Sequence, residues 1–334
     1  MPQITTIGGG TGAPTILKAL VSADFDDIKA VSAAMDSGGK TGVIRSDERD
    51  KVIAISDLLR NLIALIPNHT DSQKINSFIQ LLSYIDGRNR NLGYRIYYSL
   101  LEKYDNSFLK VQKHFEDLIE IKFAGTAIPI TLKPTNLKFS TQSGQNFHGE
   151  HELDRLSMSK NSVTKVWLEP QVKASPQALE AIKEAQYLIY CPGSLYGSVI
   201  ANFLPKGVKS ALKASQAHKI LITNLTSTRN QTHRFTPTDY LNIFQKYTQL
   251  EKPFDTIIAP DTTFQQFEKK HPQAAKIYAR EHSYFLGWPD SEFKPLKDMG
   301  IKIKKQDLYS ITPKFHRLRH NPKKLQKLLS KILK

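Results

Sequence analysis

The stretch ITTIGGGTG at residues 4–12 decides the fold. Its first four residues form a short β-rich run. The glycines then lead into residues 14–21, which have the apolar spacing of an amphipathic helix. The same order returns at once, with an apolar run at 28–35, a second glycine-rich loop at 36–42 and an apolar helix at 52–66. Strand, loop and helix alternating at these distances indicate right-handed crossovers and a parallel sheet.

The alternation is interrupted twice and then resumes. Residues 70–120 have mostly helical spacing. The next segment contains short β-like runs, such as 130–132 and 136–140, followed by a turn at 143–146, which is typical of an antiparallel insertion. The parallel pattern continues with a helix at 178–185 and strands at 187–191, 220–224 and 256–259.

We therefore predict an α/β fold, a Rossmann-like three-layer sandwich with a mainly parallel sheet. Residues 1–334 form one domain. It carries a helical insertion at about 70–120 and a small antiparallel β insertion at about 128–168. We find neither an internal repeat nor a low-complexity linker that would divide the chain further.

The composition excludes several classes of protein. The 334 residues are 40% hydrophobic, and 47 Lys and Arg against 31 Asp and Glu give a formal net charge of +16, a globular rather than a disordered balance. The single cysteine, Cys191, excludes a disulfide scaffold and a cysteine-rich zinc module. The sequence contains no run of about 18 apolar residues, which is the length needed to span a membrane. The first residues show no basic leader before an apolar stretch, so we expect a cytoplasmic protein.

The positive charge is concentrated at the end of the chain, where residues 314–334 carry eight Lys and Arg and no acid. Leu325, Leu328, Leu329 and Ile332 fall on one helical face of this segment. The segment is either a basic helix that meets an anionic surface or a helix that docks its leucines on the core, and we favour docking. Basic and aromatic residues are not interleaved as in nucleic-acid modules, so we expect no nucleic-acid partner.

Ligands of parallel α/β sheets gather at the carboxyl ends of the strands, where the glycine-rich and polar clusters of this sequence fall. In the first cluster, residues 8–12, backbone N–H groups can approach a phosphate at the start of a helix. Gly8, Gly10 and Ala13 also fit the GxGxxG/A dinucleotide fingerprint, although this match alone is weak. A tight strand-to-helix turn is the alternative.

The second cluster, residues 36–45, combines an acid, glycines and basic groups. Asp36 can hold magnesium or a hydroxyl, Gly38 and Gly39 permit close backbone approach, and Lys40 and Arg45 can offset phosphate charge. A P-loop is excluded, because Ala34 stands where its first glycine is required. Asp36 could instead be a carboxylate that only stabilises the loop.

Three further clusters follow. On the helix near residue 57, Asp57, Arg60 and Asn61 either point at a ligand or form an internal ion pair. The loop 191–198 offers Ser194 and Ser198 hydroxyls to a phosphate, while Cys191 is interpreted as core packing. Asn224, after another apolar strand, could contact a nucleoside or belong to a hydrogen-bonded surface loop.

Together these clusters resemble the CofD/YvcK family, which comprises 2-phospho-L-lactate transferases of the CofD type and gluconeogenesis factors of the YvcK type (UPF0052). Residues 7–12 look like the family's GGGTG loop, and residues 36–45 resemble its DDGGSSGxLR segment with Ser37 in place of the second acid. Residues 56–61 look like its GDxRN helix. Residues 191–196 are similar to its PGSLY motif, and residues 319–324 look like its closing RHD segment.

The resemblance implies one of two functions. The YvcK branch binds nucleotide sugars such as UDP-N-acetylglucosamine and supports carbon metabolism and cell-wall growth, hence cell shape, under gluconeogenic conditions. The CofD branch moves a phospholactyl group from a nucleotide diphosphate donor to a deazaflavin with the help of Mg²⁺. We favour the first, because Ser37 and Leu59 stand where the transferase branch is expected to carry acids. The expected partners are a nucleotide-diphosphate small molecule and further copies of this chain.

An NAD-dependent oxidoreductase would rest on the fingerprint alone, and a nucleic-acid-binding protein on the charge alone. Asp36 and Asp57 are the candidate catalytic and metal-binding carboxylates. The candidate ligand-binding residues are Gly8, Gly9, Gly10, Thr11, Gly12, Gly38, Gly39, Lys40, Thr41, Arg45, Arg60, Asn61, Gly193, Ser194, Leu195, Tyr196 and Asn224.

Overall fold

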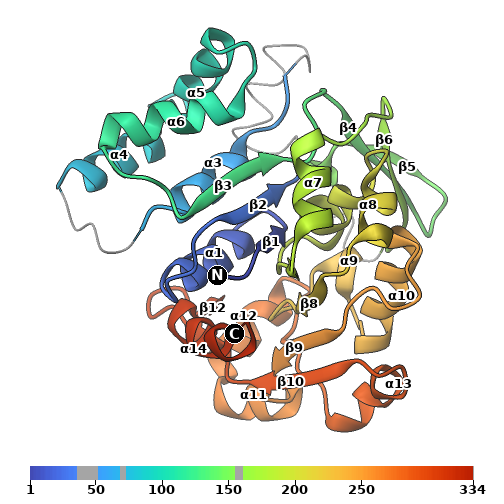
Figure 1. Cartoon of the computed structure of the whole chain (residues 1–334). Coiled ribbons are helices and arrows are strands. Elements are labelled where there is room, and N and C mark those ends of the chain that lie inside the picture. The colour runs from blue at the N-terminus through green and yellow to red at the C-terminus, as the bar shows by residue number, and fades with distance from the viewer. Residues whose placement is uncertain (36–51, 68–72, 155–160, 334) are drawn as a thin grey trace.

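The computed structural model describes residues 1–35, 52–67, 73–154 and 161–333. A seven-stranded sheet forms its centre (Figure 1). Each strand pairs with its neighbours in parallel. The strand order is β10-β9-β8-β7-β1-β2-β3. The strands are β1 (Ile4–Ile7), β2 (Ile28–Ser32), β3 (Gly125–Pro129), β7 (Tyr187–Tyr190), β8 (His218–Ile222), β9 (Thr256–Pro260) and β10 (Lys302–Gln306).

The order of the strands reverses between β1 and β7. The chain runs from β1 through β2 to β3 in one direction, and from β7 to β10 in the other. The loops after β1 and β7 therefore follow neighbouring strands at the point where the order reverses, and the carboxyl edge at such a point is where doubly wound sheets bind ligands.

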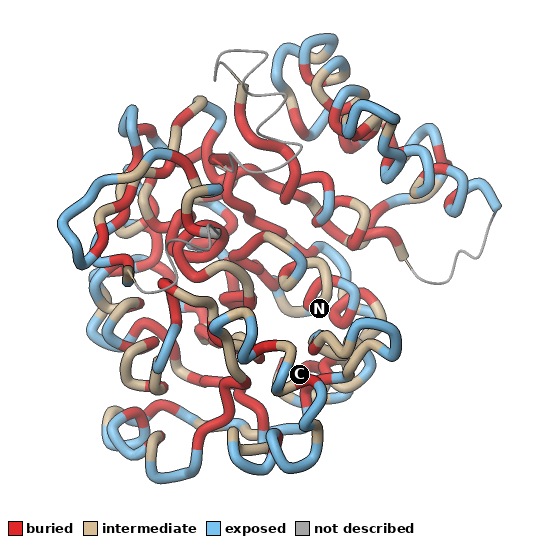
Figure 2. The backbone as a smooth tube through the Cα atoms, turned by 180° about the vertical axis from the view of Figure 1, so that it is seen from behind, coloured by how far each residue is buried: buried red, intermediate tan, exposed pale blue. Residues whose placement is uncertain are grey.

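Two groups of helices flank the sheet. Within the first group α1 packs against α3 and α14, and within the second α8 packs against α7 and α10, and α10 against α13. The first group is α1 (Gly12–Val21), α3 (Ser56–Ala64) and α14 (Pro322–Ile332); the second is α7 (Pro176–Glu184), α8 (Val208–Ala214), α10 (Pro237–Thr248) and α13 (Lys294–Asp298). Three further helices, α9 (Arg229–Thr232), α11 (Phe264–Lys270) and α12 (Pro272–Arg280), follow β8 and β9. Apart from the edge strand β10, the strands of this sheet are almost entirely buried (Figure 2). The predicted three-layer α/β architecture is confirmed.

The helical insertion consists of α4 (Gln73–Ser83), α5 (Leu92–Lys103) and α6 (Phe108–Ile119), which stand beside the β3 edge of the sheet (Figure 1). Its own small core holds it together: the rings of Phe78 and Phe115 meet edge to face at 5.4 Å. Asn91 caps α5 by accepting from the N–H of Tyr94 at 2.9 Å.

The antiparallel insertion is a three-stranded sheet, β5-β4-β6, made of β4 (Asn136–Thr141), β5 (Asn146–His148) and β6 (Val163–Glu169). The prediction of a β-like run at 130–132 is wrong. These residues form a turn in which Thr131 Oγ1 accepts a hydrogen bond from the N–H of Lys133. The strand lies just before it, as β3, and pairs with β2 in the main sheet. Short apolar runs do not reveal which sheet they join.

The basic end of the chain docks on the core, as interpreted from its leucines. A hairpin of β11 (Tyr309–Ile311) and β12 (Leu318–His320) leads into α14. Leu325 and Leu329 of α14 are fully buried, and Gln326 donates a hydrogen bond to the Ser22 carbonyl at the end of α1. No helix among the described residues is long and apolar enough to cross a membrane.

Candidate functional site at the strand-order switch

The loops that follow β1 and β7 lie against each other, because Ile7 and Tyr190 are register partners at the ends of these paired strands. A Cβ on Gly12 would collide with the Pro192 carbonyl oxygen, and one on Gly193 would stand 3.3 Å from the Gly9 carbonyl oxygen. Two of the predicted clusters, residues 8–12 and 193–196, therefore form one continuous rim.

The glycine loop of this rim offers a row of backbone donors. The N–H of Gly8 is used in the sheet, since it donates to the Val31 carbonyl at 3.1 Å. The described residues provide no acceptor for the N–H groups of Gly9, Gly10, Thr11 and Gly12. Gly10 has a φ of +63°, which favours glycine and turns this backbone toward the start of α1. Such a row at a helix N-terminus is suited to bind an anion.

Asp57 is brought to the same rim by α3, which packs on α1. A Cβ on Gly9 would collide with the Asp57 carboxylate, so only glycine permits this close approach. Asp57 is 5% exposed, and its Oδ1 accepts from Arg60 Nη1 at 2.9 Å. The Arg60 side chain is 44% exposed. The predicted ion pair thus exists, and it holds a cationic group close to the glycine loop.

Asn61, one turn beyond Asp57, is completely buried, and neither its Oδ1 nor its Nδ2 has a hydrogen-bond partner among the described residues. Buried amides are almost always paired. The Asn61 amide, which has no partner among the described residues, lies on the helix that reaches the rim. This is consistent with the prediction that polar residues of α3 point at a ligand.

The side chains of Ser194 and Asn224 form hydrogen bonds to other groups of the protein. Asn224 Oδ1 accepts from the N–H of Gly193 at 3.0 Å, and its Nδ2 donates to the Gly193 carbonyl at 2.8 Å. Ser194 Oγ accepts from the N–H of Gly197 at 3.2 Å. The Asn224 bonds lock the loop after β7 to the loop after β8, and the Ser194 bond closes a turn within the loop after β7. Leu195 and Tyr196 of this loop are buried.

Gln231, on α9, is a residue of this rim that the sequence did not single out. Its Oε1 accepts from Ser194 Oγ at 3.0 Å and from the N–H of Tyr196 at 3.1 Å. The neighbouring Asn230 is buried, and its amide has no partner among the residues that the structure describes. Gln231 lies seven residues after Asn224 in the sequence, and no local pattern marks it as a site residue.

Replacing Asn224 with alanine is expected to lower the free energy of unfolding by about 2 kcal/mol, because both bonds to Gly193 are lost. Urea unfolding measures the change. Asn76→Ala, at an exposed position on α4, is the control and should stay within about 0.5 kcal/mol of the parent. An equal loss in both variants would show that Asn224 does not lock the two loops.

The closing segment of the chain also reaches this edge. His320, at the end of β12, hydrogen-bonds to the backbone of Thr223, directly after β8, and burial lowers the pKa of His320 to about 4. His320 Nε2 and Thr223 Oγ1 are both sealed from solvent without a partner among the described residues. The β11–β12 hairpin is therefore attached next to Asn224.

The second predicted cluster lies outside the described residues. It comprises Asp36, Gly38, Gly39, Lys40, Thr41 and Arg45. Among the residues that are described, no three His, Cys, Asp or Glu side chains lie close enough to hold a metal ion. Cys191 is 1% exposed, and burial raises the pKa of its thiol, which agrees with a packing role.

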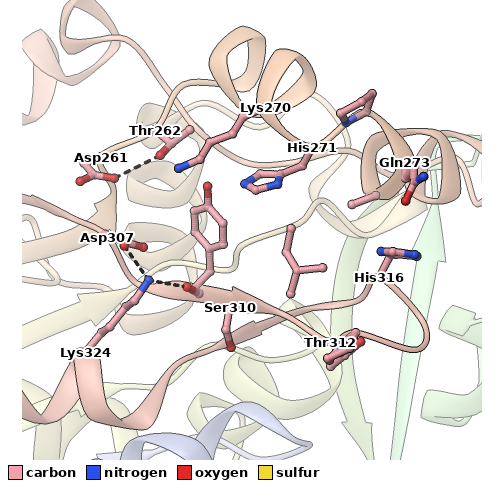
Figure 3. Close-up of a pocket in the computed structure, with 15 residues that line it drawn as sticks. Asp261, Thr262, Lys270, His271, Gln273, Asp307, Ser310, Thr312, His316 and Lys324 are labelled. Carbon is pink, nitrogen blue, oxygen red and sulfur yellow. Dashed lines mark hydrogen bonds and ion pairs between the residues drawn. The ribbon is translucent and has the colours of Figure 1, made fainter.

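A pocket of about 670 Å³ opens further along the same edge, at the carboxyl ends of β9 and β10 (Figure 3). The close-up shows Lys270 and His271 across from Ser310 and His316. Lys324 of α14 bonds both the Asp307 carboxylate and the Tyr309 carbonyl. The sequence did not predict this pocket, because it is formed by α11, α12 and the β11–β12 hairpin, whose packing has no local signature.

The fold and the rim together define a doubly wound α/β protein with its site at the strand-order switch. The family model for 2-phospho-L-lactate transferase CofD matches residues 4–309. The chain belongs to the CofD family, and the resemblance noted in the sequence is confirmed.

Relatives and solved structures agree with this assignment. The gluconeogenesis factor of Listeria monocytogenes is 30% identical over 74% of this chain and 74% of its own length. A relative from Aquifex aeolicus is 28% identical over 99% of this chain and 96% of its own length. A crystal structure of a UPF0052 family member from Bacillus halodurans, 22% identical, superimposes with a TM-score of 0.82 over 98% of this chain and 99% of its own, so it has the same fold.

Proposed function

We propose that this chain binds a nucleotide sugar of the UDP-sugar class at the rim between β1 and β7. It would act as a regulator of carbon metabolism and cell-wall growth, and hence of cell shape, rather than as a transferase. The observation that carries the proposal is the row of N–H groups from Gly9 to Gly12, which have no acceptor in the described part of the chain and lie against the loop after β7. The relatives named gluconeogenesis factor support the regulatory branch.

Different residues of the rim would have different roles in binding a diphosphate. The glycine-loop N–H groups and the start of α1 would donate to the phosphate oxygens. Arg60, held by Asp57 at 2.9 Å, would offset the phosphate charge with a guanidinium whose position is already fixed. Ser194 and Asn224 would act indirectly, because they keep the loop after β7 in place.

In this proposal magnesium would bind at the rim together with the phosphates of the ligand, and not to protein side chains alone. Asp57 supplies one carboxylate near the glycine loop, and its Oδ1 already pairs with Arg60. Magnesium commonly binds through one or two carboxylates together with substrate phosphates and water. The ion would then supply charge neutralisation on the diphosphate, and binding would be stronger with magnesium than in EDTA.

Isothermal titration calorimetry with UDP-N-acetylglucosamine tests the proposal, with magnesium in one arm and EDTA in the other. We expect binding, with the sugar nucleotide recovered intact on chromatography. Arg60→Gln should weaken binding at least tenfold. Arg95→Gln, which removes the same charge from an exposed position on α5, should change the affinity less than twofold.

Two outcomes would contradict the proposal. One is equal affinity of the parent and the Arg60→Gln variant. The other is formation of a phospholactyl deazaflavin when the protein is given a phospholactyl nucleotide and a deazaflavin, which would assign the chain to the transferase branch.

A further inference from the structure

A second groove lies at the opposite, amino edge of the sheet, away from the rim. It has a volume of about 850 Å³ and runs past the first residues of β7, β8, β9 and β10 to the end of α14. Gln186, Tyr187 and Gln216 line it on one side. The groove is large enough for a small ligand, and it lies at the edge where doubly wound sheets do not place their main site.

The charges in this groove have a single sign. Lys302 and Lys304 come from β10, Lys331 comes from α14, and none of the described residues that line the groove is acidic. None of these three ammonium groups has a carboxylate partner in the described part of the chain. Three cations from two distant segments of the sequence thus converge on one hollow without internal compensation.

Asp255, whose carboxylate lies 4.0 Å from the lining residue His218, is already compensated. Asp255 pairs with Lys252 at 3.3 Å and accepts from the N–H of Lys219 at 2.9 Å. His218 lies between Asp255 and the groove, with its Nε2 2.9 Å from Thr256 Oγ1. Burial is the main reason that the pKa of His218 lies below its usual value; Lys302, Lys252 and Lys219 lower it further, and Asp255 opposes them. The groove is therefore cationic at neutral pH through its lysines alone.

Protection of an open sheet edge explains only part of this arrangement. β10 is an edge strand of the sheet, and lysines on edge strands prevent pairing with other chains. That role accounts for Lys302 and Lys304. It does not account for Lys331, which belongs to a helix, or for the concave shape into which all three project.

We propose that this groove binds a compact small molecule carrying several phosphate groups, independently of the glycine-loop rim. Ammonium groups bind phosphate as point charges, so three of them around one hollow favour a ligand with closely spaced negative charges. The Gln186 and Gln216 amides and the Tyr187 ring would provide neutral contacts beside the phosphates.

Titration of the whole chain with inorganic tripolyphosphate tests this proposal. The parent should bind, and the variant Lys302→Gln/Lys304→Gln/Lys331→Gln should bind at least tenfold more weakly. A control with Lys110, Lys133 and Lys276 replaced by glutamine loses the same charge from exposed positions elsewhere and should stay within twofold of the parent. Should the triple variant fail to fold, Lys331→Gln alone should weaken binding at least threefold.

Several results would overturn the proposal. Equal losses in the triple variant and its control would show that tripolyphosphate responds only to the overall charge. Absence of binding would leave edge protection as the role of the β10 lysines. Displacement of tripolyphosphate by saturating UDP-N-acetylglucosamine would place the anion at the rim. Tighter binding of a single-stranded oligonucleotide through the same three lysines would assign the groove to nucleic acid.

Discussion

Replacing Gly12 with alanine is expected to lower the free energy of unfolding by about 3 kcal/mol and to abolish ligand binding at the rim. The added Cβ would collide with the carbonyl oxygen of Pro192, which is backbone and cannot rotate away. The loop after β1 and the loop after β7 would have to separate. Urea unfolding and calorimetry with UDP-N-acetylglucosamine measure the two effects.

A matched glycine serves as the control for this prediction. A Cβ on Gly87, in the helical insertion, would meet nothing within 4 Å. Gly87→Ala should therefore change stability by less than about 1 kcal/mol and leave the affinity for the ligand unchanged. If the two variants behave alike, the rim is not as tightly packed as the structure describes.

The second large effect is a dependence of stability on pH that originates in His320. Burial lowers its pKa to about 4 in the folded chain, whereas an unfolded histidine has a pKa of about 6.5. Between these values the unfolded chain binds more protons than the folded one, so stability falls as the pH falls from 6.5 to 4. The loss from this group is up to about 3 kcal/mol, and it is complete below pH 4.

Urea unfolding at several pH values between 7.5 and 4.5 measures this effect in the parent and in His320→Gln. In a plot of the free energy of unfolding against pH, the variant should lack the part of the slope that the titration of His320 contributes. His148→Gln, at an exposed position on β5, should keep the slope of the parent. Identical pH profiles in the parent and His320→Gln would show that His320 does not become less basic on folding.

The architecture could be predicted because its signals are local. Buried strands such as β7 and β9 are nearly continuous apolar runs, and a glycine-rich loop marks the end of β1. β10 escaped prediction for a physical reason: its sequence KIKKQ belongs to an edge strand with exposed lysines, and such a strand needs no apolar run. The β11–β12 hairpin has three-residue strands, which are too short to show a period.

The rim could be predicted as a place but not in its detailed contacts. The glycine loop and the loop after β7 follow paired strands and lie together, as expected for the carboxyl ends of a parallel sheet, and Asp57 is added to them by the packing of α3 on α1. The partners of Ser194 and Asn224 lie 37 and 31 residues away in sequence, on Gln231 and Gly193. A polar side chain after a strand has the same sequence signature whether it faces a ligand or fastens a neighbouring loop.

The docking of α14 on α1 has a consequence for synthesis of the chain. The helix that follows the glycine loop is among the first to leave the ribosome, yet the surface that covers it, with Leu325 and Leu329, is more than 300 residues behind. Until translation reaches that surface, the apolar side of α1 stays open to solvent or to chaperones. A ribosome that stalls before residue 322 would release a polypeptide in which the side of α1 that α14 normally covers is exposed, a species prone to aggregate.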